Sequence, residues 1–592
     1  MTWWRQVVDR RSIGDWGFEL RGDELADLTW RGHPVLRSVR VAVRDRDWRS
    51  VTLEVDSIAT TDTELILHIR SHGSGSSFTG VVRAEARDAG LRVVCDLASE
   101  QPFETNRTGL VALLPPGIAG LPLTVGHSDG STVEASLRTS VSPHQPIGDI
   151  EALTWASDCA VSARFTGEVF EMEDQRNWTD ASFKVYSRPL ALPFPYPVAA
   201  GERVVQSIEL TAHAVEADSE SAVPSTQPAR TTRRDSVALQ TGGVFPAIGV
   251  GASTAPDPVS GSAPTAASLP HLASTLVELD LGWPGWPAVL ERAAGAGRPL
   301  DVRLVLPAAC DDASIGPPPA LDHAVRALSG HTVARITAFQ PTGDARHVAD
   351  HTAIALLRAS LRGRTVDVVA GVRSHFTELN RESDRVPPDV TGIVFAVTPL
   401  FHSLDTEQLV ESVAMQRLVA QQAVEIAGGR HVHVGPISLR PHFNDAATTA
   451  PPRPASSDLS AGHGSHLTGP ADPRQSAPEL AAWTIASAAA LSVAGVASLT
   501  FFEDWGPRGL IADTGTPRPA AAAVAALASL SGGRLLSGSS PDGLVWALGA
   551  LGPSGTETVL GANIGRASRV IEVRTPGGIR VMHLAPGEWR RA

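Results

Sequence analysis

The first third of the chain alternates apolar and polar residues with a period of two. Stretches such as VTLEVDSI from Val51, ELILHIR from Glu64 and VVQSIEL from Val204 follow this rhythm, with Gly, Asp and Asn between them. Strands that bury one face of a sheet show this alternation. The pattern predicts an N-terminal β-sandwich over residues 1–215.

The rhythm changes after a polar segment, residues 216–240, which has too few apolar residues to pack and is predicted to be a linker. Residues 241–532 then alternate short apolar strands with helical stretches rich in Ala and Leu, which is typical of repeated βα units. The eight predicted strands begin at Phe245, Ser274, Leu300, Val333, Val366, Gly392, His431 and Ser498. Eight such units close into a TIM (β/α)8 barrel.

The last part of the chain, residues 533–592, returns to short alternating strands such as GLVWALGAL from Gly543 and RVIEVRT from Arg569. This pattern predicts a second, smaller β-sandwich. The expected fold is therefore multidomain, with a central TIM barrel between an N-terminal and a C-terminal β-sandwich.

Composition and charge argue against several functional classes. The chain has 592 residues, a net charge of −13 and no run of Lys and Arg, so a nucleic-acid surface is not expected. The three cysteines, Cys95, Cys159 and Cys310, lack CxxC spacing, which fits a reduced cytoplasmic protein better than a disulfide framework. No stretch resembles a signal peptide or a membrane span, so no membrane partner is expected.

Candidate catalytic residues gather where the predicted barrel strands end, as they do in TIM-barrel enzymes. They are Asp280 after strand two, Arg373, Glu378 and Asn380 after strand five, His402 after strand six, Arg440 and Asn444 after strand seven, and Glu503 and Trp505 after strand eight. The loop after strand seven is long, and residues 446–474 are expected to form a lid or a mobile segment.

Two carboxylates across a barrel mouth, with an imidazole between them, can act as general base and general acid in a hydrolysis. We expect Glu378 to be the base, held ionised by arginines nearby in the sequence, and Glu503 to be the acid. His402 or Arg440 would stabilise the oxyanion. Alternatively, each of these side chains caps a helix or bridges a loop.

A polar stretch in the predicted sandwich, FEMEDQRNWTDASFK from Phe170 to Lys184, contains the chain's single lysine. Burying so many polar groups costs free energy unless they bind something or form a satisfied network. We expect the stretch to reach the barrel mouth and to contact substrate through Glu173, Asp174, Arg176, Asn177 and Lys184. The alternative is a structural polar network that joins the sandwich to the barrel.

Metal and cofactor signals are weak. His431 and His433 begin a strand, at the end opposite the expected site, and the glycine-rich IGVGAS lacks the features of a nucleotide-binding turn. No ligand cluster with metal spacing is evident at the strand ends. We therefore expect neither a metal nor an organic cofactor, and activity that survives chelation.

Several long polar strings resemble the D-apionate lactonase family. They include SPHQPIGDI from Ser142, FEMEDQRNWTDASFKVY from Phe170, FTELNR from Phe376, TPLFHSLD from Thr398, GPISLRPHFN from Gly435 and TFFEDWGPRGL from Thr500. The resemblance implies an enzyme that opens a small sugar lactone, D-apionolactone, to D-apionate with water. It further implies a role in branched-pentose catabolism inside the cell, without an organic cofactor.

Two other functions remain open at this point. A retaining glycoside hydrolase of barrel-plus-sandwich architecture would carry carboxylates about 5 Å apart, after strands four and seven. Our strand count instead places Glu378 after strand five and Glu503 after strand eight, but the count slips to four and seven if the strand at Phe245 lies outside the barrel. A third possibility is a carbohydrate-binding protein whose barrel has lost its chemistry.

Overall fold

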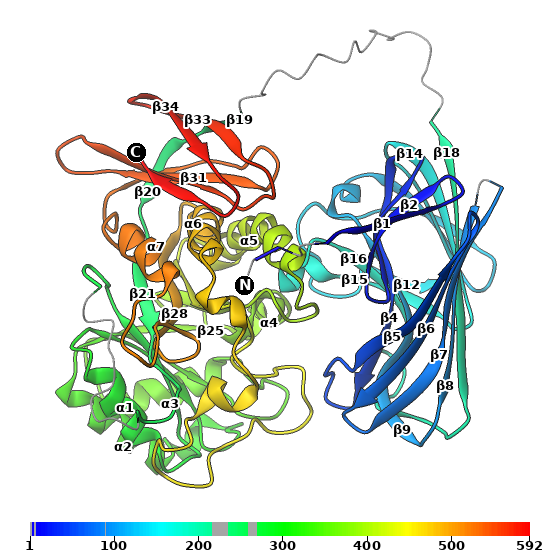
Figure 1. Cartoon of the computed structure of the whole chain (residues 1–592). Helices are drawn as coiled ribbons and strands as arrows, with labels where there is room; N and C mark the ends of the chain where they lie inside the picture. The colour runs from blue at the N-terminus through cyan, green and yellow to red at the C-terminus, as the bar shows by residue number, and fades with distance from the viewer. Residues whose placement is uncertain (1–2, 5–6, 89, 216–234, 259–268) are drawn as a thin grey trace.

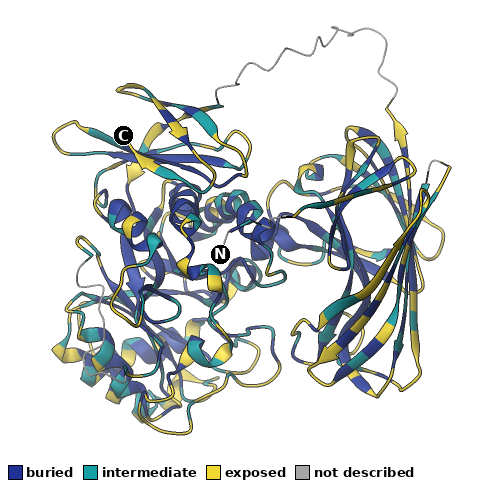
Figure 2. Ribbon diagram, in the orientation of Figure 1, coloured by how far each residue is buried: buried dark blue, intermediate teal, exposed yellow. Residues whose placement is uncertain are grey.

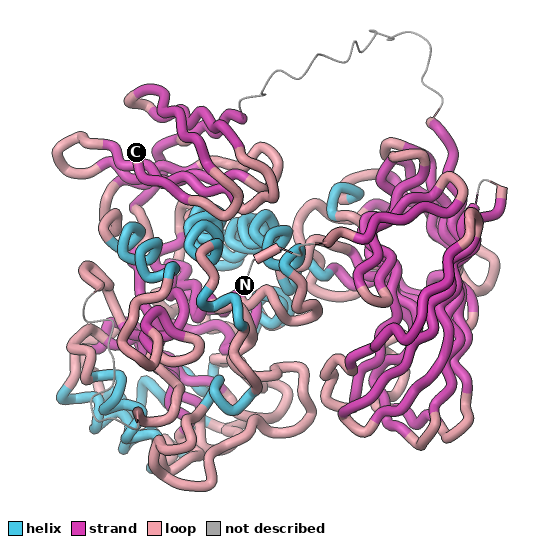
Figure 3. The backbone as a smooth tube through the Cα atoms, viewed as in Figure 1, coloured by secondary structure: helices cyan, strands magenta, loops and turns pink. Residues whose placement is uncertain are grey.

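The computed structural model describes residues 3–4, 7–88, 90–215, 235–258 and 269–592. An N-terminal β domain lies on one side of a central barrel, and a smaller C-terminal β domain packs on the barrel helices (Figure 1). Helices gather around the barrel, whereas the N-terminal domain is built almost entirely of strands (Figure 3). The predicted combination of a TIM barrel with two β-rich flanks is confirmed.

The N-terminal domain consists of two sheets that share one hydrophobic core. One sheet contains β1 (Asp9–Ile13), β2 (Trp16–Arg21), β3 (Glu24–Trp30), β4 (His33–Asp45), β9 (Phe103–Leu114), β16 (Phe183–Ser187), β15 (Phe170–Asp174) and β12 (Ile147–Ile150), with β17 (Tyr196–Val198) on β9. The other contains β11 (Thr132–Ser136), β10 (Pro122–Gly126), β13 (Ala152–Ala156), β14 (Cys159–Thr166), β18 (Arg203–Ala214), β8 (Gly90–Ser99), β7 (Ser76–Arg87), β6 (Glu64–Gly73) and β5 (Thr52–Thr60). In β8 every second side chain is buried, as the alternation predicts.

The central barrel is a closed parallel sheet. Its strands are β21 (Ala247–Gly251), β22 (Thr275–Asp280), β23 (Leu300–Val305), β24 (Val333–Phe339), β25 (Asp367–His375), β26 (Gly392–Val397), β27 (His431–Ile437) and β28 (Val496–Trp505). β21 pairs with both β22 and β28, so the strand near Phe245 belongs to the barrel. Glu378 therefore follows the fifth strand and Glu503 lies at the end of the eighth. A short strand, β29 (Gly509–Ile511), extends β28.

Helices cover the outside of the barrel, whose strands are buried (Figure 2). They are α1 (Trp286–Ala294), α2 (Pro319–Ala327), α3 (His351–Leu361), α4 (Phe376–Arg381), α5 (Thr406–Ala427), α6 (Glu479–Leu491) and α7 (Pro519–Ala528). α6 is apolar on all sides because it is covered on every face, by α5, α7 and β28 and by three strands of the C-terminal domain.

The C-terminal domain differs from the expected boundaries. Its sheets are β19 (Asp235–Ala238), β33 (Arg569–Thr575) and β34 (Gly578–Leu584), and β20 (Gln240–Val244), β30 (Arg534–Ser537), β31 (Val545–Leu551), β32 (Glu557–Asn563) and β35 (Trp589–Arg591). Residues 235–240, predicted as linker, thus supply strands to this domain. β19 pairs with β33, which lies more than 300 residues later in the chain. No local sequence pattern therefore indicates that β19 is a strand. Residues 216–234 of the predicted linker lie outside the described residues.

The start of the chain also differs from the expected domain division. Trp3 belongs to the hydrophobic core of the barrel and not to that of the sandwich, and its carbonyl accepts a hydrogen bond from the Thr406 hydroxyl at 2.6 Å. Figure 1 shows the N-terminus beside the barrel helices. No helix in the described part of the chain combines the length and apolar character needed to cross a membrane.

Candidate active site

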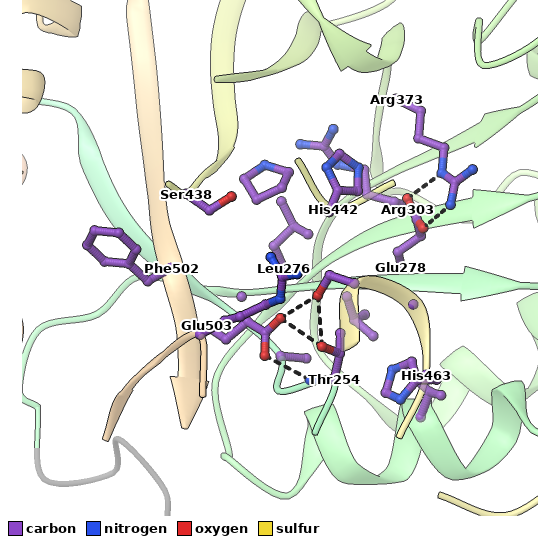
Figure 4. Close-up of a pocket in the computed structure, with 18 of the residues that line it drawn as sticks. Thr254, Leu276, Glu278, Arg303, Arg373, Ser438, His442, His463, Phe502 and Glu503 are labelled. Carbon is purple, nitrogen blue, oxygen red and sulfur yellow. Dashed lines mark hydrogen bonds and ion pairs between the residues drawn. The ribbon is translucent and has the colours of Figure 1, made fainter. Parts of the chain in front are cut away.

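A pocket opens at the carboxyl ends of the barrel strands (Figure 4). Its polar lining comes from the ends of β22, β23, β25 and β28 and from the segments that follow β21 and β27. The charged, imidazole and hydroxyl side chains in it are Thr254, Glu278, Arg303, Arg373, Ser438, His442, His463, Ser465, Glu503 and Arg508. Catalytic groups of TIM-barrel enzymes lie at this face, so the pocket is the candidate active site.

Glu503 is held at the pocket wall by three donated hydrogen bonds. The Thr254 backbone amide donates to Oε2 at 3.0 Å, and the Thr254 hydroxyl donates to Oε1 at 2.8 Å. The Ser465 hydroxyl also donates to Oε1, at 2.6 Å. Thr254 lies in the loop after the first strand, and Ser465 lies in the long loop after β27. The long loop therefore folds over the site and helps to hold the carboxylate in place.

Glu278 faces the same pocket and forms a bidentate ion pair with Arg373. Arg373 Nε lies 2.7 Å from Oε2 and Nη2 lies 2.5 Å from Oε1. Burial alone would raise the pKa of Glu278, but the Arg373 guanidinium outweighs it and lowers that pKa to about 2. Glu278 was not among the residues predicted for the site, although a carboxylate between the apolar residues of LVEL in a barrel strand was a usable signal.

The stabilisation supplied by the Glu278 carboxylate is expected to fade in acid. The pKa of a freely solvated glutamate is 4.5, whereas that of Glu278 in the fold is about 2, so the contribution is complete above about pH 4.5 and is lost as the pH falls towards 2. The difference in unfolding free energy between wild type and Glu278→Gln should shrink by about 2 kcal/mol between pH 6 and pH 3. Denaturant titrations at both pH values measure this, and a difference independent of pH would contradict the ion pair.

Two imidazoles in the pocket are neutral at pH 7. Burial lowers the pKa of His442 to about 4 and that of His463 also to about 4, and nearby guanidinium groups act in the same direction. The His463 ring stacks on Trp283 with centroids 6.0 Å apart. Neutral imidazoles can donate or accept a hydrogen bond without adding charge, which suits them to bind the hydroxyl groups of a sugar.

Of the side chains predicted for the site, Glu503 and Arg373 line this pocket, and several others bridge loops instead. Asp280 pairs with Arg453 at 2.5 Å. Arg440 lies 3.7 Å from Asp472. The Trp505 side chain is 4% exposed and packs in a small apolar cluster apart from the pocket.

Several predicted residues join the N-terminal domain to the barrel. Asn380 Nδ2 donates to Asn177 Oδ1 at 2.9 Å, and Asn444 Nδ2 donates to the carbonyl of Asp47 at 2.8 Å. We call this contact region the domain joint; Figure 1 shows β15 and β16 on the side of the N-terminal domain that faces the barrel. Its position explains the mixed polar composition of residues 170–184 without requiring a ligand.

The core of the domain joint is a buried ion pair between Asp174 and Arg176, with side chains 0% and 3% exposed. The carboxylate also caps the turn Gln175–Trp178 by accepting from the Arg176 amide. The remaining guanidinium hydrogens reach the carbonyls of residues 138–140 at 2.9–3.0 Å. Asp174 and Arg176 therefore have their hydrogen-bonding capacity used within the protein.

Lys184 and His402 also lie at the domain joint. Lys184 is the strand partner of Glu173 and pairs with its carboxylate. Burial opposes ionisation of Glu173, but Lys184 and other nearby cations hold its pKa below the usual range. His402 Nδ1 lies 2.5 Å from Asp180 Oδ2, and neither His402 nor Lys184 lines the pocket.

Lys184→Met is expected to lower the unfolding free energy by about 1–3 kcal/mol, because Glu173 would keep a largely buried charge and its ion pair with Arg381 is long, at 3.9 Å. The kcat/KM for substrate should change little. Denaturant unfolding and steady-state kinetics on the same preparation check both. A large fall in kcat/KM at unchanged stability would show that Lys184 contributes to substrate binding.

Glu378 lies apart from the pocket, in a cluster with His375 and Asp445. Burial, followed by the Asp445 carboxylate, raises the pKa of Glu378 to about 7. The expectation that neighbouring arginines hold it ionised is therefore wrong, since Arg373 turns to Glu278. The expectation that no ligand cluster lies at the strand ends is wrong as well, because the ligand atoms of these three residues all lie within 4.8 Å of one another.

Several known proteins are similar to this chain in sequence or in fold. A protein named D-apionate lactonase from Brucella anthropi is 28% identical over 564 residues, which are 87% of this chain and 86% of that protein. A GH30 endoxylanase from Clostridium papyrosolvens C71 is 11% identical with a TM-score of 0.39, over 61% of this chain and 99% of that one. A putative aldose 1-epimerase from Escherichia coli K12 is 11% identical with a TM-score of 0.27, over 35% of this chain and 99% of that one. TM-scores this low carry no argument about this chain.

Two family models cover most of the sequence. The D-apionate lactonase N-terminal domain matches residues 4–215, and the D-apionate lactonase TIM barrel domain matches residues 248–532. The chain belongs to the D-apionate lactonase family.

Proposed function

We propose that this protein hydrolyses D-apionolactone to D-apionate in the pocket at the barrel mouth, as a step in the catabolism of the branched pentose apiose. The family consists of lactone-hydrolysing enzymes. The Brucella anthropi relative, which is named D-apionate lactonase, aligns with 87% of this chain.

The observation that carries the proposal is the pairing of two differently held carboxylates in one pocket. Glu278 is neutralised by a bidentate guanidinium, whereas Glu503 is held by neutral donors. Among the described residues, Glu503 Oε2 accepts a hydrogen bond from the Thr254 amide alone. Its second lone pair can therefore accept a proton from water.

Hydrolysis needs a base for water, a donor for the carbonyl oxygen and a proton for the departing ring oxygen. Glu503 takes the proton as the water oxygen attacks the lactone carbonyl carbon. Arg373 stabilises the oxyanion, since Glu278 engages Nε and Nη2 and leaves Nη1 available. When the ring carbon–oxygen bond breaks, Glu503 returns its proton to the leaving oxygen, which becomes a hydroxyl group. In this mechanism Glu503 serves first as base and then as acid, and Glu378 takes no part.

A substrate panel tests the function. Purified protein is given a set of five- and six-membered aldonolactones and a matched set of aryl glycosides, with acid release followed by pH-stat and aglycone release by absorbance. We expect acid release, fastest with D-apionolactone, and no aglycone release. Aryl glycoside cleavage without acid from any lactone would favour a glycoside hydrolase that uses Glu278 and Glu503.

A further inference from the structure

Three potential metal ligands meet where barrel strands end, outside the pocket. His375 closes β25, Glu378 lies in the first turn of α4, and Asp445 follows β27. One ligand atom from each lies within 4.8 Å of the others. The cluster thus joins two chain segments separated by about 70 residues at one point beside the domain joint.

The two carboxylates of this cluster, a buried Asp445 and a partly buried Glu378, lie beside one histidine. Asp445 is 4% exposed, and its Oδ1 has no hydrogen-bond partner among the described residues. Glu378 Oε2 accepts from the Ser374 hydroxyl at 2.8 Å, which is a neutral donor. Arg373, two residues before His375, is engaged by Glu278. A buried, unpaired carboxylate oxygen is costly, and a bound cation would remove that cost.

The surroundings of His375 fit a metal ligand. Nε2 forms a hydrogen bond with the Thr398 hydroxyl, and Nδ1 forms one with the Asp445 carboxylate; a metal ion would take the place of the Nδ1 proton. Metal-binding histidines commonly donate their second ring N–H in this way. Nδ1 lies 3.1 Å from Asp445 Oδ2, close to the roughly 3.0 Å between adjacent ligands that each lie about 2.1 Å from one metal ion. The Glu378 carboxylate supplies the third ligand atom, within 4.8 Å of the other two.

We propose that His375, Glu378 and Asp445 bind one divalent transition-metal cation. One imidazole nitrogen with two carboxylate oxygens suits Mn²⁺ or Zn²⁺. His347, whose buried Nδ1 has no hydrogen-bond partner in the described chain, interacts electrostatically with Asp445 and is the candidate for a further ligand. The cation would neutralise the buried carboxylates and tie α4 to the loop after β27. The proposed metal site does not depend on which residue acts as the base in the pocket.

Metal analysis and calorimetry on protein without a polyhistidine tag test this proposal. The protein is stripped with a chelator and titrated with Mn²⁺ or Zn²⁺, and bound metal is counted after dialysis. We expect one ion per chain and a Tm that rises on metal addition, because the ion binds the folded state. Glu378→Gln and Asp445→Asn should each weaken binding by about 100-fold or more.

The stripped variants provide a second, independent readout. Metal should raise the Tm of stripped wild type and leave the Tm of stripped Glu378→Gln and Asp445→Asn nearly unchanged, because only wild type keeps all three ligands. Glu382→Gln is the matched control: Glu382 pairs with Arg385 at 2.6 Å outside the cluster, and its variant should bind metal as wild type does. Absence of binding up to about 1 mM metal, or equal binding by wild type, Glu378→Gln and Asp445→Asn, would overturn the proposal.

Discussion

Glu503→Gln is expected to lower kcat for lactone hydrolysis by about 10²–10⁴-fold, the usual cost of removing one acid–base group. Gln keeps the size of the side chain, and its amide oxygen at the Oε1 position can still accept from the Thr254 and Ser465 hydroxyls. It cannot take a proton from water. The fold should therefore survive while the chemical step fails, and KM should change much less than kcat.

Steady-state kinetics and thermal unfolding of Glu503→Gln measure these two effects. Ser465→Ala is the graded comparison, because it removes one of the hydrogen bonds to Oε1 and leaves the carboxylate in place; it should cost far less than Glu503→Gln. Glu425→Gln, at an exposed position of α5, controls for the loss of a carboxylate elsewhere. A kcat near that of wild type in Glu503→Gln would show that Glu503 takes no part in the chemical step.

Arg176→Met is expected to lower the unfolding free energy by about 3–5 kcal/mol, the typical cost of leaving one member of a buried ion pair alone. Asp174 would keep a fully buried charge, and the carbonyls of residues 138–140 would lose their donor. The folded fraction should keep the kcat of wild type, because Arg176 lies in the domain joint and does not line the pocket.

The matched control for Arg176→Met is Arg164→Met in the same domain. Arg164 pairs with Glu151 at 2.5 Å, but the side chains are 62% and 34% exposed, and an exposed pair contributes only about 0–1 kcal/mol. Denaturant unfolding of both variants distinguishes the effect of breaking a buried ion pair from the effect of removing an arginine charge. Equal, small losses in the two variants would show that residues 174–176 do not hold the joint together.

The barrel was predictable because its signal is local. Each strand is a short apolar run with its helix beside it in sequence, and the glycine-rich stretch after Phe245 is recognisable as the first strand even without its pairing to β28. The alternation in the N-terminal domain was equally direct. Strand β19 was missed because its partner, β33, comes more than 300 residues later, and four residues that follow a long polar segment carry no pattern of their own.

The candidate site was only partly predictable, because long-range partners decide what each side chain does. Glu503 was found from its place at a strand end. Glu378 was expected to be held ionised by Arg373 and Arg381, but Arg373 pairs with Glu278, 95 residues away, and burial raises the pKa of Glu378 despite Arg381. The polar segment at residues 170–184 was assigned to the substrate, whereas its Asn177 meets Asn380 across 203 residues. When only composition and sequence neighbours are known, residues that form a structural network through such pairings can be mistaken for a binding site.

The most direct test of the account follows D-apionolactone by NMR in the presence of stoichiometric wild-type or Glu503→Gln protein. The account predicts that wild type converts the ring-closed lactone to the open carboxylate. With Glu503→Gln the lactone should stay closed, while line broadening shows that it still binds the pocket. Opening of the lactone by Glu503→Gln at the wild-type rate, or no opening by wild type, would contradict the claim that Glu503 carries lactone hydrolysis at the barrel mouth.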